Sequence, residues 1–114
     1  MIMKSKLSSR IALGALLMGC VVGWSAQADV ASTWAMNCAA CHGKDGKGQT
    51  MMGRKLSIRD MTDPSVQAAF TDAQATDAIK NGITKDGTEQ MKAFGGKLSD
   101  ADIKALVAYV RSLK

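Results

Sequence analysis

Several features are scarce in this chain, and each scarcity narrows what the chain can be. It has one histidine and, after its first 28 residues, only two cysteines, which leaves the ligand set of a four-coordinate structural zinc site incomplete. No stretch alternates well enough to be a strand, so a thiol-disulfide site, which follows a strand in an α/β pattern, has no framework here. Beyond residue 28 there are 12 basic and 10 acidic residues, too small an excess for a nucleic-acid-binding surface.

The first 28 residues have the pattern of a secretory signal peptide. Lys4, Lys6 and Arg10 form a basic start with no acidic residue near it. An apolar stretch too short to span a bilayer comfortably follows, and the small-residue segment AQA ends at Ala28. The pattern predicts a cleaved signal peptide over residues 1–28 and export to the bacterial periplasm. Residues 29–114 show no repeat, linker or low-complexity tract, and they are predicted to form one domain.

Two other interpretations of this leader are weaker. An uncleaved membrane anchor is disfavoured because tryptophan and small polar residues end the apolar run early and no stop-transfer charges follow. Lipidation at Cys20, within LMGC, is disfavoured because Met18 fits the lipoprotein pattern poorly and the residues after Cys20 stay apolar. Lipidation remains open as an alternative.

Helix signals recur along the predicted domain. An opening helix is expected over about residues 30–40, and Asp63 is expected to cap a helix that starts at Pro64. A further helix is expected from residue 71 or 72 to the Asn-Gly pair at 81–82. The last begins with a capping box at Ser99 and Asp102 and places apolar residues on one face. The predicted class is all-α, with short helices joined by glycine-rich loops.

The segment CAACHGKDGKG contains the pentapeptide C-x-x-C-H, made by Cys38, Cys41 and His42. In an exported chain this is the attachment sequence of haem c. Two thioethers fix two edges of the macrocycle to one helical turn, and the next residue projects its imidazole onto the iron. We therefore predict one haem c, attached through Cys38 and Cys41, with His42 as the proximal iron ligand. Because His42 is the only histidine, a second histidine ligand from the same chain is excluded.

A methionine is the natural sixth ligand, because its thioether suits iron and raises the reduction potential. Met36 is tied to the proximal side by its closeness to Cys38, and the pair at 51–52 lies just beyond a glycine-rich turn. Met91 lies in a glycine-containing stretch with no helix pattern, which can fold over the opposite haem face. Spacing favours Met91 and leaves Met61 as the fallback.

Taken together, these segments resemble the class I c-type cytochromes, specifically the small bacterial single-haem kind, over essentially all of the predicted domain. CAACHGKDGKG resembles their attachment segment, and MKAFGGKLSDADIKALVAYVRSLK resembles their ligand loop and C-terminal helix. The resemblance implies the class I cytochrome c fold, with about four to five short helices wrapped around one covalently bound haem. It also implies Met91 as the distal ligand, and a close crossing of the first and last helices near Trp34 and Tyr109.

The chain departs from this family in its use of proline. Many relatives have a proline after the attachment histidine whose carbonyl accepts the imidazole N–H, and many have another near the ligand methionine. Here the only proline is Pro64, at a predicted helix start. The carbonyl that orients His42 is therefore not identified by the sequence, although some acceptor is expected.

Coordination by His42 and a methionine leaves iron no open position for a substrate. The expected function is a soluble periplasmic one-electron carrier between respiratory redox partners, not an enzyme. We expect a monomer that binds redox proteins weakly and transiently at the exposed haem edge, with no nucleic acid or small-molecule substrate. Arg54 is a candidate contact for a haem propionate. The residues expected around the edge are Gly43, Lys44, Lys47, Lys92 and Lys97.

Two alternatives share these motifs. One is a haem enzyme or gas sensor with a labile sixth ligand. The other is a dedicated haem subunit of a larger redox complex.

Overall fold

The computed structural model describes residues 14, 19 and 26–114. Most of the predicted signal peptide, Cys20 included, lies outside the described residues, and cleavage and lipidation stay predictions. The first helix begins at Ala26, so the last three residues of the predicted signal are helical. None of the helices in the described part of the chain has the length and apolar character needed to cross a membrane.

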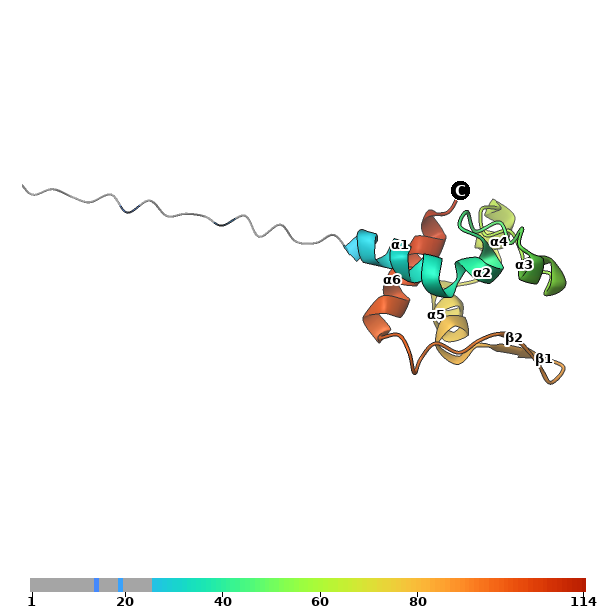
Figure 1. Cartoon of the computed structure of the whole chain (residues 1–114). Helices are drawn as coiled ribbons and strands as arrows, with labels where there is room; N and C mark the ends of the chain where they lie inside the picture. Colours follow the sequence, from blue (N-terminus) through green and yellow to red (C-terminus); the bar gives the residue numbers. More distant parts are fainter. Residues whose placement is uncertain (1–13, 15–18, 20–25) are drawn as a thin grey trace, which may run out of the picture.

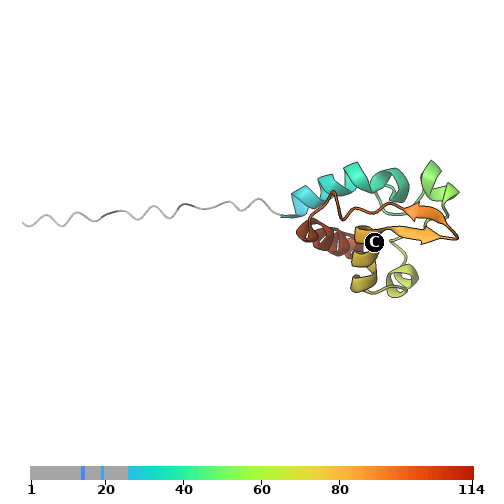
Figure 2. The ribbon, with the colours of Figure 1, turned by 90° about the horizontal axis from the view of Figure 1, so that it is seen from below.

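The described residues form six helices and one pair of short strands (Figure 1). Helix α6 lies across α1 and beside α5, while α2 and α3 follow on from α1. The strand pair projects from the end of α5, on the side away from α6 (Figure 2). The elements are α1 (Ala26–Asn37), α2 (Ala39–His42), α3 (Met51–Lys55), α4 (Pro64–Ala68), α5 (Asp72–Asn81), β1 (Ile83–Lys85), β2 (Thr88–Met91) and α6 (Asp100–Ser112).

The predicted helix starts are confirmed at the level of individual hydrogen bonds. Asp63 caps α4 by accepting from the Ser65 backbone N–H, and Pro64 is the first residue of that helix. Ser99 and Asp102 form the expected capping box at the start of α6. A second capping box, between Thr71 and Gln74, starts α5. Each box satisfies two backbone N–H groups that lack a partner within the helix.

The expectation that the domain contains no strand is wrong. Strands β1 and β2 form an antiparallel pair in which Ile83 faces Met91, with a bulge after Ile83. Asp86 and Gly87 make the turn with positive φ angles of 52° and 75°. Asp-Gly in such a two-residue turn matches the right-handed twist of the strands it joins. Met91 therefore ends a strand instead of lying in an irregular loop.

The helix count also differs from the four to five expected. The predicted helix over residues 30–40 is interrupted at Cys38, which separates α1 from α2. The five-residue helix α3 was not predicted. The mostly helical class itself is confirmed.

The hydrophobic core lies where α1, α5 and α6 meet. Ile103 and Leu106, each 1% exposed, are its centre, and Trp34 joins them from α1. The Trp34 ring lies 5.2 Å from the Tyr109 ring, which confirms the expected contact between the first and last helices. Full burial of such apolar side chains contributes roughly 1.5–3 kcal/mol each. Trp34, Ile79 and Leu106 of this core also line a cavity.

Candidate functional site

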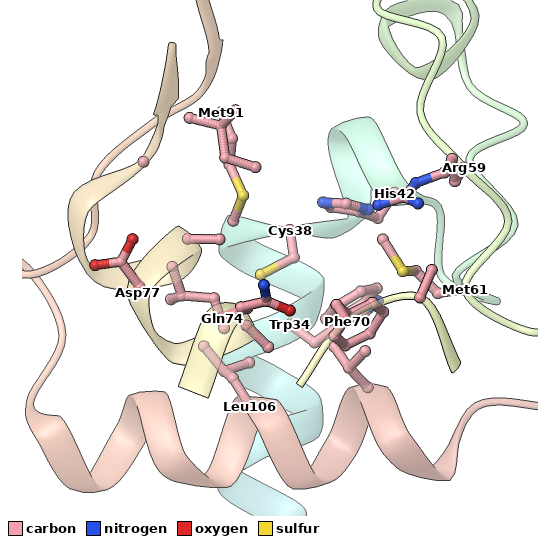
Figure 3. A pocket seen from close by; sticks show the side chains of 17 residues that line it. Trp34, Cys38, His42, Arg59, Met61, Phe70, Gln74, Asp77, Met91 and Leu106 are labelled. Carbon is pink, nitrogen blue, oxygen red and sulfur yellow. The ribbon is translucent and has the colours of Figure 1, made fainter. Parts of the chain in front are cut away.

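A cavity of about 430 Å³ opens between α2, α5, α6 and the strand pair (Figure 3). This volume is within the range of cofactor pockets. The walls are largely apolar, with Trp34 and Leu106 of the core exposed to the cavity. The predicted site residues among its lining are Cys38, His42, Met61 and Met91.

The cysteines and the histidine are presented by the single turn of α2. The His42 backbone N–H donates to the Cys38 carbonyl at 2.9 Å, which fixes the spacing between these two side chains. The loop that follows folds back onto the same turn. Thr50 donates from its hydroxyl to the Cys41 carbonyl at 2.7 Å, and the Gly48 N–H donates to the His42 carbonyl at 2.8 Å. These bonds satisfy carbonyls at the end of the helix, which have no partner within it.

Both thiols of the attachment sequence are free and half-buried. Cys38 lines the cavity, whereas Cys41 is not part of the lining. Burial raises the pKa of the Cys38 thiol to about 11, and the charge of the nearby Cys41 adds to the shift. Both effects favour the protonated thiol.

The imidazole of His42 is held by packing. The Trp34 ring lies 5.6 Å from it at an angle of 39°, and Trp34 Nε1 donates to the carbonyl of Gly43 at 3.0 Å. Burial lowers the pKa of His42, so the ring is kept neutral, the form that binds metals. Its Nδ1 is buried, and within the described structure no hydrogen-bond partner reaches it. The expected hydrogen bond from this ring to an acceptor is therefore not formed among the described residues.

Two methionines line the cavity, and they lie on different sides of it. Met91, at the end of β2, lies to one side of the Cys38 sulfur, and His42 and Met61 lie to the other (Figure 3). The backbone at Gly82 passes close to the backbone at Met91. A Cβ added at Gly82 would lie only 2.6 Å from the Met91 carbonyl oxygen. The remaining methionines of the predicted domain are exposed and lie outside the lining: Met36, Met51 and Met52.

The arginine that lines the cavity is Arg59, not Arg54. Arg54 is exposed on α3, where its guanidinium makes a long contact of 3.4 Å with the Gln49 carbonyl. Arg59 lies beside His42 in Figure 3 and is also exposed, which places it at the rim. Sequence reasoning missed Arg59 because it lies in an irregular segment with no pattern that fixes its direction.

The lysines expected around the haem edge are exposed: Lys44, Lys47, Lys92 and Lys97. Gly43, which was expected with them, is buried instead. Its carbonyl accepts the hydrogen bond from Trp34, so it belongs to the support of His42 and not to the surface.

The residues of the site fit a haem. The cavity offers apolar walls for the macrocycle, a thiol and a neutral imidazole on one helical turn, a thioether across from them and a cation at the rim. The buried Nδ1 of His42 without a partner marks a ring whose hydrogen bonding is incomplete in the chain alone.

Comparisons with known proteins agree with this chemistry. A family model described as cytochrome c oxidase, cbb3-type, subunit III, matches residues 25–110. A cytochrome c6 of Microcystis aeruginosa is 35% identical over 82 residues, which cover 72% of this chain and 90% of that protein. The cbb3-type cytochrome c oxidase subunit FixPc of Rhizobium leguminosarum bv. viciae is 38% identical over 77 residues, covering 68% of this chain. That match covers only 24% of the FixPc subunit, so the chain spans about a quarter of its length.

Among solved structures, the KustC0563 c-type cytochrome is 33% identical and superposes with a TM-score of 0.66. The match covers 74% of this chain and 95% of that one. The likeness therefore extends over nearly the whole of the solved chain.

Proposed function

This chain belongs to the small single-haem class I c-type cytochromes, electron carriers with a covalently attached haem c, and we propose that it shuttles single electrons between redox proteins in the periplasm. The observation that carries the proposal is the placement of His42 and Met91 across the same cavity (Figure 3). The haem supplies an iron that alternates between two oxidation states. The chain's own residues bind this group, orient it and exclude water from it.

We assign the attachment to Cys38 and Cys41, and the two axial positions to His42 and Met91. Axial ligands must approach the iron from opposite faces of the ring. Met91 meets this condition because it lies away from His42, whereas Met61 lies on the same side as His42 (Figure 3). If His42 and Met91 both held the iron of a bound haem, no position on it would be left for a substrate, which supports a carrier over an enzyme.

We assign the contact with a haem carboxylate to Arg59 in place of Arg54. A guanidinium forms paired hydrogen bonds with a carboxylate, and Arg59 is the arginine that lines the cavity. The exposed lysines Lys44, Lys47, Lys92 and Lys97 would supply positive surface charge suited to weak and fast binding of an acidic redox partner. The signal peptide pattern over residues 1–28 supports the periplasm as the site of this exchange.

Replacement of each methionine tests the ligand assignment. Met91→Ala should abolish the charge-transfer absorption of the thioether-iron bond, because the remaining thioether in the cavity lies on the His42 side. Met61→Ala is the matched control, since it removes the same side chain from the same cavity and should preserve the band. The reverse result would transfer the axial role to Met61. A strong reaction of the native ferrous protein with carbon monoxide would favour an enzyme or gas sensor with a labile sixth ligand.

A second candidate function is that of a haem subunit in a larger complex. It is favoured by the family model, which is named for an oxidase subunit, and by the FixP-type relatives. Co-purification with a membrane complex at high salt would support the subunit. A carrier held by exposed charges should dissociate under those conditions.

A further inference from the structure

The last turn of α6 is joined to the segment around α4 by one arginine. Arg111 donates from Nε to Asp72 Oδ1 at 2.7 Å and from Nη2 to the Phe70 carbonyl at 2.8 Å. Its Nη1 donates to both the carbonyl and the side-chain oxygen of Gln67, at 2.5 and 3.0 Å. The guanidinium carbon also lies 4.3 Å from the centroid of the Phe70 ring. All three guanidinium nitrogens are therefore used, across separations of 39 to 44 residues.

Gln67 completes this connection from the other side. Its Nε2 donates to the Met61 carbonyl at 2.6 Å and to the Val110 carbonyl at 2.9 Å. The Gln67 side chain thus links the backbone at Met61 to the backbone of α6 at Val110. Figure 1 and Figure 2 both show α4 close to the C-terminal end of α6.

Besides these bonds, the segment over residues 61–71 is held by the Met61 N–H, which donates to the Gly46 carbonyl at 2.8 Å, and by hydrogen bonds within the segment itself. Helix α4 has five residues, too few to be stable alone, and it contains no buried residue. The carbonyls of Gln67 and Phe70, at its C-terminal end, are those that receive the Arg111 hydrogen bonds. Charge-assisted bonds of this kind are stronger than ordinary ones.

The same segment is one wall of the cavity. Met61, Ala69 and Phe70 all line it, and Phe70 lies across from Met91 in Figure 3. Arg111 is not part of the lining, so it contacts the Phe70 ring from outside the cavity. Its side chain is 29% exposed, which keeps its charge only partly screened by water. The connection therefore fixes an apolar wall and places behind it the ion pair of Arg111 and Asp72.

We propose that Arg111 and Gln67 are positioning residues that raise the reduction potential of the site by holding the Phe70 wall against the cavity. The inference rests on the proposed function, in which this cavity holds the haem. Reduction would remove one positive charge from a bound haem iron, so a wall that keeps water out would favour the reduced state, and Arg111 would keep the Asp72 carboxylate behind that wall from opposing reduction. Loss of the connection should lower the potential.

The test uses the holoprotein with its haem attached. The variants are Arg111→Leu, Arg111→Lys and Gln67→Ala, and the control is Lys104→Leu, which removes one charge from the exposed side of the same helix. The readouts are the midpoint potential at fixed ionic strength and the hydrogen exchange of the Gln67 and Ala69 amides, both hydrogen-bonded within α4.

Arg111→Leu should lower the potential below that of both the wild type and Lys104→Leu. It should also speed exchange at the two amides by roughly tenfold or more, the effect of losing one charged hydrogen bond. Arg111→Lys keeps the positive charge but loses the planar set of donors of the guanidinium. Amide exchange should therefore rise, while the potential should fall less than in Arg111→Leu. Gln67→Ala leaves every charge in place and should still lower the potential.

Three outcomes would overturn the proposal. One is a shift in potential no larger for Arg111→Leu than for Lys104→Leu, and another is a lower potential with unchanged exchange. The third is full recovery of both readouts by lysine. A wild-type protein whose mass shows no attached haem would instead refute the proposed function.

Discussion

Replacement of Gly82 by alanine should displace Met91 without touching it. Gly82 ends α5 with a φ of 75°, in the left-handed region that favours glycine. A Cβ there would meet the Met91 carbonyl oxygen at 2.6 Å and the Ala93 backbone nitrogen at 2.9 Å. Because both neighbours are backbone atoms, the chain around Met91 must move to make room.

The size of the effect follows from two costs. An alanine in the left-handed region costs about 1–2 kcal/mol. Ordinary contact begins near 3.4 Å, so the Met91 carbonyl must retreat by about 0.8 Å from its 2.6 Å approach. Overpacking of this kind typically costs about 1–3 kcal/mol. The free energy of unfolding should therefore fall by about 2–5 kcal/mol.

Gly87 supplies the matched control. Its φ is also 75°, but a Cβ at that position would meet nothing within 4 Å. In Gly87→Ala the free energy of unfolding should therefore fall only by the cost of the backbone conformation, about 1–2 kcal/mol. The thioether-iron absorption should be kept. Gly82→Ala should lose more stability and weaken that absorption. Equal losses in denaturant unfolding, with the band intact in both variants, would refute the reasoning.

Two further predictions concern the support of the site. Hydrogen bonds from the Ser65 side chain and backbone lower the pKa of Asp63 below its usual 3.8, so its contribution to stability is present above that pH and is lost as the pH falls through the lowered pKa. Asp63→Asn, which can still cap α4, should flatten the pH dependence of unfolding below about pH 4, and an unchanged slope would contradict this. Trp34→Phe leaves the Gly43 carbonyl without its buried donor and should cost about 1–3 kcal/mol in denaturant unfolding, whereas an unaltered midpoint would show that the bond contributes nothing.

The sequence predicts the helices best where local chemistry decides them. Ser99 and Asp102 form the capping hydrogen bonds that their spacing indicates, and Asp63 accepts from the Ser65 N–H with Pro64 as the first residue of the helix. These signals are reliable because a cap involves residues within three positions of one another. The order of the cysteines and histidine on one turn is local in the same sense, and it predicts a haem attachment site of which Cys38 and His42 line the cavity.

The strand pair shows where sequence reasoning stops short. All of β1 and the first half of β2 are exposed, so the alternation that marks a half-buried strand is absent. The turn was nevertheless signalled by Asp86-Gly87, the strongest short hairpin pattern there is. A hairpin turn at Asp86-Gly87 predicts strands on both sides of it, and Met91 ends the second of them, opposite Ile83.

The residues that complete the cavity depend on contacts that no local pattern encodes. Arg54 and Arg59 are both basic residues after the attachment loop, and only the path of the chain between them brings Arg59 to the rim. Arg111 lies in the last turn of α6, a common position for a cation, yet it bonds to residues about 40 positions earlier. Its role arises because α4 is too short to hold itself, so its unpaired carbonyls need a donor from elsewhere. In this domain the local pattern predicts which groups bind the haem, whereas long-range hydrogen bonds from Arg111 and Gln67 join one wall of the cavity to α6.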